Sequence, residues 1–91
     1  MQKITPFAIP SEPKFEVELP RASTILDVSV MQGQPYFWIQ HESDAVVIWR
    51  TFILIPAGGI VPMDVELFYI GNFNVKNNKI FIFEEIGGAK S

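Results

Sequence analysis

Residues 24–41 read TILDVSVMQGQPYFWIQH, and this stretch decides the fold class. From Leu26 to Val30, apolar residues alternate with polar ones, which is the two-residue period of a β-strand with one buried face. Gly33 then marks a turn, and the aromatic and β-branched residues that follow Pro35 suit a second strand. The stretch therefore predicts a β-hairpin with Leu26 and Val30 on the same buried face.

Residues 46–55, VVIWRTFILI, carry apolar side chains on both faces, and Arg50 is the one charge among them. Phe52 falls on one face and Trp49 on the other, because successive side chains of a strand point to opposite sides. A strand that is apolar on both faces needs cover on both. We therefore expect a central strand, or a strand whose second face is covered by another subunit.

Three further strands are predicted, over residues 15–19, 65–75 and 79–84. The first is half-exposed, because its apolar positions alternate with glutamates. Gly71 interrupts the second, and a glycine inside a strand pattern marks a bulge or the close approach of another backbone. Asparagine tolerates positive φ, so the pair at 77–78 predicts the turn of a second hairpin.

Four prolines between residues 5 and 20 allow this first part of the chain only short strands of the edge type. No window of ten or more residues sustains a helical period with caps. The sequence therefore predicts an all-β fold, a small antiparallel sandwich or partly open barrel of five or six strands. We expect one domain over residues 1–86 and a flexible tail over residues 87–91.

Composition excludes several classes of protein. The chain has 91 residues, 48% hydrophobic and 19% charged, which rules out a disordered chain and a multidomain enzyme. The absence of cysteine removes disulfides, thiolate zinc sites and cysteine nucleophiles. A net charge of −3 with scattered cations argues against nucleic acid as a partner. No apolar run predicts a secretion signal or a membrane span, so we expect a cytoplasmic protein.

No set of residues predicts catalysis. His41, the single histidine, stands beside Glu42, Ser43 and Asp44, but neighbours in one turn point apart, whereas a catalytic triad converges from different elements. We interpret residues 41–44 as a solvated polar loop. With one histidine and no cysteine, a metal site would have to be built almost entirely from carboxylate ligands. Gly58–Gly59 is not followed by a predicted helix, which a phosphate-binding loop needs. We therefore expect no enzymatic activity, no metal and no cofactor.

Arg50 is the most informative single residue, because a guanidinium inside an apolar strand needs a partner. One interpretation is an ion pair with a carboxylate on a neighbouring strand, for which the candidates are Asp27, Glu66 and Glu84. The other is a ligand site, in which aromatic rings stack a flat group and the guanidinium binds a phosphate or carboxylate. The residues predicted to bind such a ligand are Arg50, Trp49, Trp38, Tyr69 and Thr51.

Four segments in order resemble a family of small uncharacterised proteins from bacteriophages and prophages. They are ILDVSVMQGQPYFW at 25–38, RTFILIPAGG at 50–59, YIGNF at 69–73 and FIFEE at 81–85. The loop at 57–59 departs from the family's pattern. The resemblance brings no established activity and implies expression in the cytoplasm of an infected bacterium.

Twelve aromatic residues are many for one small core, so we expect surplus apolar surface to be covered by a homo-oligomer. Two functions follow as hypotheses. The first is a non-enzymatic binding protein that holds a small nucleotide-like ligand. The phage origin that the resemblance implies, together with the expected oligomer and Arg50 beside aromatic residues, favours a sponge that sequesters a nucleotide-derived bacterial immune signal. The alternative is a protein-interaction module, an inhibitor of a host protein or an assembly adaptor.

Overall fold

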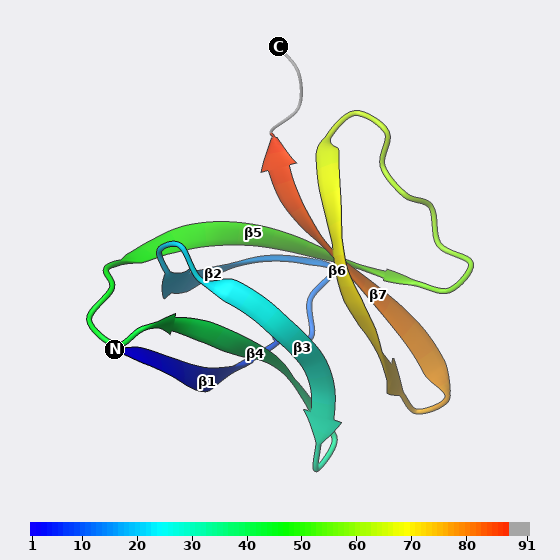
Figure 1. Cartoon of the computed structure of the whole chain (residues 1–91). Coiled ribbons are helices and arrows are strands. Elements are labelled where there is room, and N and C mark those ends of the chain that lie inside the picture. Colours follow the sequence, from blue (N-terminus) through cyan, green and yellow to red (C-terminus); the bar gives the residue numbers. More distant parts are fainter. Residues whose placement is uncertain (88–91) are drawn as a thin grey trace.

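The computed structural model describes residues 1–87, which form seven β-strands in two antiparallel sheets and contain no helix (Figure 1). The strands are β1 (Gln2–Ala8), β2 (Lys14–Pro20), β3 (Thr24–Met31), β4 (Gln34–Glu42), β5 (Val47–Pro56), β6 (Glu66–Val75) and β7 (Asn78–Gly87). The all-β prediction is confirmed. Over residues 1–87 there is accordingly no helix long and apolar enough to cross a bilayer.

One sheet has three strands in the order β1-β4-β3, and the other has four in the order β2-β5-β7-β6. The two sheets face each other as a sandwich and do not close into a barrel. β5 is central in the four-stranded sheet, between β2 and β7, as its two apolar faces predict. In Figure 1 the paired strands β6 and β7 run steeply across the direction of β5.

The strand count exceeds the predicted five or six because β1 was not expected. The amide of Ile9, directly after β1, donates to the carbonyl of Pro35 at 2.9 Å. Because the pairing of β1 with β4 has no bulge, the backbone N–H and C=O groups of the odd-numbered β1 residues all point toward β4, and those of the even-numbered residues point away from it. Pro6, at an even position, has its nitrogen at the free edge, where no N–H is needed. Pro20 has the same placement in β2.

Pro35 faces β1 and has no N–H to give to the carbonyl of Ile9, a buried residue. The side chain of Gln34 supplies the missing donor. Its Nε2 donates to the carbonyl of Ile9 at 3.0 Å and to that of Pro35 at 2.8 Å. A side chain thus completes the backbone pairing where the sequence places a proline inside the three-stranded sheet.

Replacing Gln34 with alanine is expected to lower the free energy of unfolding by about 1–3 kcal/mol, because the buried Ile9 carbonyl loses its donor. Chemical denaturation measures the change. Gln40→Ala is the matched control, since Gln40 makes an exposed side-chain contact to Gln2, and its effect should stay within about 0.5 kcal/mol. Equal effects of the two substitutions would show that Gln34 has no such role.

Both hairpins turn through two residues with positive φ. Gln32 and Gly33 have φ of 53° and 79°, and Lys76 and Asn77 have φ of 49° and 68°, as type I′ turns require. The predicted hairpin over residues 24–41 is confirmed. The second turn lies one residue earlier than predicted, because Asn78 already pairs with Val75 as the first residue of β7.

Two bulges adjust which side chains face inward. In β3 the register shifts between Ile25 and Asp27, so Leu26, predicted to be buried, is exposed and Ile25 packs against the core instead. In β6 the register shifts at Gly71, as the glycine predicts. A Cβ built on Gly71 would lie 3.3 Å from Cγ2 of Val28, so the glycine allows β6 and β3 to approach closely.

The core lies between the sheets and is centred on aromatic rings. Phe37 of β4 packs against Phe52 of β5 with 4.8 Å between ring centroids, and Phe15 of β2 stacks on Phe52 at 5.6 Å. These rings belong to a buried cluster made of Ile9, Phe15, Leu19, Phe37, Ile39, Phe52, Phe73 and Ile82. Strand β7 continues through Gly87, one residue past the expected domain boundary, and the rest of the predicted tail lies outside the described residues.

Candidate functional site

Arg50 points to the inner face of the four-stranded sheet and is neutralised there. Its Nε donates to Oε2 of Glu84 and its Nη2 to Oε1, both at 2.7 Å, and its Nη1 donates to Oγ of Ser23 at 3.1 Å. The two charged side chains are 18% and 12% exposed. Glu84, one of the three carboxylates considered, is the partner. Each of the three guanidinium nitrogens thus has an acceptor within the chain.

The other predicted site residues do not meet Arg50. Trp49 and Thr51 flank it in β5, so they project from the opposite face of the sheet. Tyr69 projects from the same outer face. It pairs with Phe83 of β7, which pairs with Ile53 of β5, and residues paired across strands point to the same side of a sheet. The five predicted ligand-binding residues therefore do not form one site, since residues adjacent in a strand cannot line one pocket on one face.

Trp38 lies on the other sheet. It occupies β4 next to Phe37, which faces the core, so Trp38 projects from the outer face of the three-stranded sheet. Its Nε1 donates to Oγ of Ser29 at 2.7 Å, which satisfies the indole N–H within its own sheet. The three-stranded sheet thus separates Trp38 from Arg50, and both sheets separate it from Trp49, Thr51 and Tyr69.

His41 is buried within β4 rather than exposed in a polar loop, which corrects the sequence-based interpretation of residues 41–44. Its Nδ1 donates to the backbone carbonyl of Glu42 at 2.8 Å, and its Nε2 pairs with the hydroxyl of Thr5 at 2.9 Å. Both ring nitrogens have partners, and the contact with Thr5 joins β4 to β1. The ring is held as a structural element between these strands.

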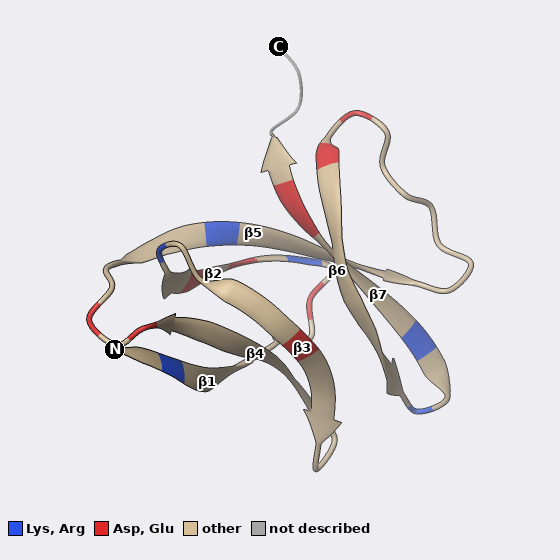
Figure 2. Ribbon diagram, in the orientation of Figure 1, with Lys and Arg blue, Asp and Glu red and all other residues tan. Residues whose placement is uncertain are grey.

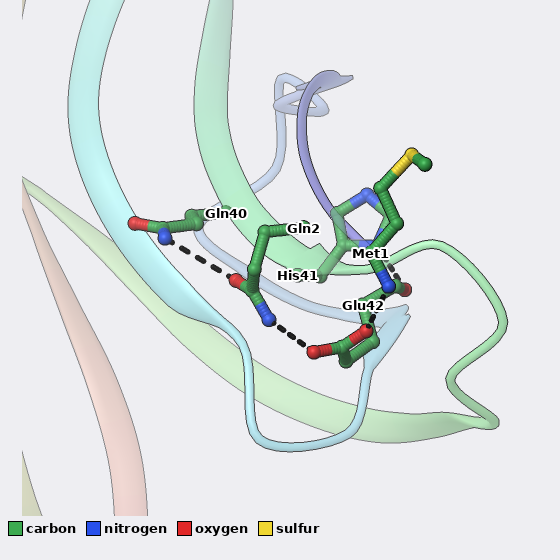
Figure 3. A network of polar contacts seen from close by, with 5 residues as sticks. All are labelled: Met1, Gln2, Gln40, His41 and Glu42. Atoms are coloured by element: carbon green, nitrogen blue, oxygen red, sulfur yellow. Dashed lines mark hydrogen bonds and ion pairs between the residues drawn. The ribbon is translucent and has the colours of Figure 1, made fainter.

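Beside His41, exposed polar groups join the beginning of β1 to the end of β4 (Figure 3). The α-amino group of Met1 contacts Oε1 of Glu42 at 2.7 Å, and Gln2 Nε2 donates to Oε2 of Glu42 at 2.6 Å. Gln40 in turn donates to Gln2 at 3.2 Å. The hydrogen bond from the amino group, followed by that from Gln2, lowers the pKa of Glu42 below its ordinary value. This network closes the sheet end and lines no cavity.

The charges of the molecule are dispersed. Figure 2 shows Lys and Arg at single positions spread over both sheets, rather than gathered on one face. Over residues 1–87, no group of three or more His, Asp or Glu side chains is placed to hold a metal ion. The described residues therefore offer no broad anion-binding surface.

The structure reveals a pocket of about 650 Å³ that the sequence did not indicate. We call it the end pocket, because it opens at the end of the sandwich where the β1–β2 connection passes the β3–β4 turn. Its floor is the edge of the core. The lining residues are Ala8, Ile9, Pro10, Ser11, Glu12, Pro13, Glu16, Val17, Gly33, Gln34, Pro35, Leu54, Pro56, Phe73, Val75 and Ile80.

The end pocket combines apolar walls with negative charge. Leu54, Phe73 and Ile80 form part of the apolar lining, while Glu12 and Glu16 are exposed carboxylates. Among the described residues that line it, none is Lys, Arg or His. Such a cavity binds an apolar group by burial and attracts a cation rather than an anion.

The sequence signal for this pocket was present but was interpreted differently. Four of the lining residues are prolines, which the sequence marks as breaks between strands. They stiffen connections from different parts of the chain that the fold brings together at one end.

Comparison with family models, with curated proteins and with solved structures finds no match. The resemblance to phage proteins stays a prediction.

Proposed function

We propose that the protein is a non-enzymatic binding protein whose ligand occupies the end pocket. The observation that carries the proposal is an open apolar cavity of about 650 Å³ between the two sheets. This volume falls within the range of about 300–1,000 Å³ that small-molecule sites occupy. Rigid prolines border it, which favours a preformed site with little ordering cost on binding.

The proposed ligand has an apolar body and a cationic group. The body replaces water against Leu54, Phe73 and Ile80, and the cation lies near the carboxylate of Glu12 in the β1–β2 connection. A nucleotide-derived signal, the ligand first expected, receives no support from this charge, because its phosphates would face a carboxylate. The proposal of a phage sponge for such a signal rests on the sequence resemblance alone.

Isothermal calorimetry with octylammonium and with octanoate tests this proposal, because the two probes share a chain length and differ in charge. We expect octylammonium to bind at least about tenfold more tightly, which corresponds to one favourable charge interaction. Removing the carboxylate in the Glu12→Gln variant should abolish the preference. Glu18→Gln is the matched control, since Glu18 is an exposed glutamate that does not line the pocket.

A second variant locates the binding. Ser11 lines the pocket and is exposed, so Ser11→Trp should obstruct the entrance without disturbing the core, and binding of octylammonium should fall. Equal binding of octanoate, binding that survives Ser11→Trp, or no binding of octylammonium would each overturn the proposal. A phosphate-bearing nucleotide that competes with octylammonium would return the function to nucleotide sequestration.

A further inference from the structure

The outer face of the four-stranded sheet is unusually apolar. Cross-strand alignment places Ile53, Phe83 and Tyr69 in one row and Thr51, Glu85 and Leu67 in the next. Trp49 is 65% exposed and Tyr69 48% exposed. We define the outer apolar face by the residues Val47, Trp49, Ile53, Ile55, Leu67, Tyr69, Phe81 and Phe83.

The outer face of an antiparallel sheet in a two-layer protein is ordinarily solvated and polar. Here the three-stranded sheet covers the other side of β5, and residues 1–87 form no third sheet. Ile53 and Ile55 of the outer apolar face are nevertheless buried within the chain, and Gly59 of the β5–β6 connection lies beside Ile55. The exposed members of the face are Val47, Trp49 and Tyr69. An exposed tryptophan and an exposed tyrosine within an apolar patch are typical of an interface between proteins. We therefore expect this face to contact another protein molecule.

The charges around this face point to the partner. Lys79 lies two residues before Phe81 in β7, so its side chain projects from the same outer face. It is exposed and lies at the end of the face near the β6–β7 turn. Glu18 pairs with Trp49 and Glu66 with Gly87, so both carboxylates lie at the opposite end. The cation and the carboxylates thus occupy opposite ends along the strands. If a second copy packs face to face with its strands running in the opposite direction, Lys79 of each copy lies near Glu18 and Glu66 of the other.

A central ion pair lies between these two ends. Lys14 contacts Oε1 of Glu85 at 3.2 Å across β5, so these two charges compensate each other within one copy. Lys79, Glu18 and Glu66 form no ion pair in the described part of the chain. They are the charges left for contacts between copies.

We propose that two copies of this chain associate through their outer apolar faces. The arrangement is isologous, with a two-fold axis perpendicular to the strands, so that the same patch contributes from both sides. Trp49 and Tyr69 are the buried anchors, and Lys79 of each copy lies near the carboxylate end of the other. The end pocket lies between the two sheets, away from this interface, so this inference is independent of the proposed ligand.

Sedimentation equilibrium on the full chain tests the proposal. The native chain is expected to have the mass of a dimer, and Trp49→Glu that of a monomer, because a buried carboxylate without a partner opposes association. Ile4→Glu is the matched control. Ile4 is an exposed apolar residue on the outer face of the three-stranded sheet, so this variant should remain dimeric.

Charge reversal tests the orientation. Lys79→Glu should weaken the dimer, and the combined Lys79→Glu/Glu18→Lys/Glu66→Lys variant should restore it, because the reversed ends are again complementary. Unchanged circular dichroism in Trp49→Glu shows that the fold is intact. A monomeric native chain, a dimer that survives Trp49→Glu, or a dimer disrupted by Ile4→Glu would overturn the proposal. The same holds if the native chain purifies with a host protein seated on Trp49.

Discussion

Arg50→Ala is expected to lower the free energy of unfolding by about 3 kcal/mol, because it leaves the mostly buried carboxylate of Glu84 without its partner. The native pair has two parallel hydrogen bonds of 2.7 Å, the geometry in which a guanidinium and a carboxylate interact most strongly. Because both side chains keep a small exposed fraction, water can partly solvate the unpaired carboxylate. The expected loss of stability is therefore at the lower end of the range for buried ion pairs. Urea denaturation measures the loss.

The double variant Arg50→Met/Glu84→Leu separates the cost of an unpaired charge from the worth of the pair. With both charges removed, stability should return to within about 1–2 kcal/mol of the native value, because no buried charge remains. Lys14→Ala serves as the surface control. It breaks an ion pair whose lysine is largely exposed, so its effect should be below about 1 kcal/mol. A loss in Arg50→Ala no greater than in Lys14→Ala would contradict the assigned role.

Phe37→Ala is expected to cost about 3–5 kcal/mol, because it removes a large buried ring and leaves a cavity at the centre of the core. Phe37 is fully buried and contacts Phe52 across the two sheets. A domain of this size has a total stability of roughly 5–14 kcal/mol, so much of the protein would unfold on moderate heating. Thermal and chemical unfolding followed by circular dichroism measure the change.

Phe68→Ala provides the comparison for Phe37→Ala, since it is the same chemical change at an exposed position. Its effect should stay below about 1 kcal/mol. If both substitutions destabilised the protein equally, the contact between the sheets through Phe37 would not be the centre of the core.

Much of the fold follows from local pattern. The hairpin over residues 24–41 and the central position of β5 are predicted by alternation and by apolar character on both faces, which depend on neighbouring residues alone. The prolines between residues 5 and 20 predicted only short strands of the edge type, and β1 is an edge strand to which the sequence assigned no range. The compatibility of Pro6 with a strand depends on which edge of the sheet faces solvent, and that is a property of the assembled sheet.

The candidate site was less predictable. The sequence indicated that Arg50 needs a partner and that Glu84 was one of three candidates, but the choice depends on the register between β5 and β7. The predicted ligand site joined Arg50 to Trp49 and Thr51, which are its neighbours in β5 and therefore project from the opposite face of the sheet. The end pocket was missed because its lining comes from loops and strand ends that are far apart in sequence.

The placement of Pro6 and Pro20 at free edges has a consequence for how copies of the molecule meet. A fibril grows when each new strand adds a continuous ladder of hydrogen bonds to the last. On the outer edges of β1 and β2, a proline leaves one rung of that ladder without a donor. Open-ended growth by strand addition along these two sides is thereby interrupted.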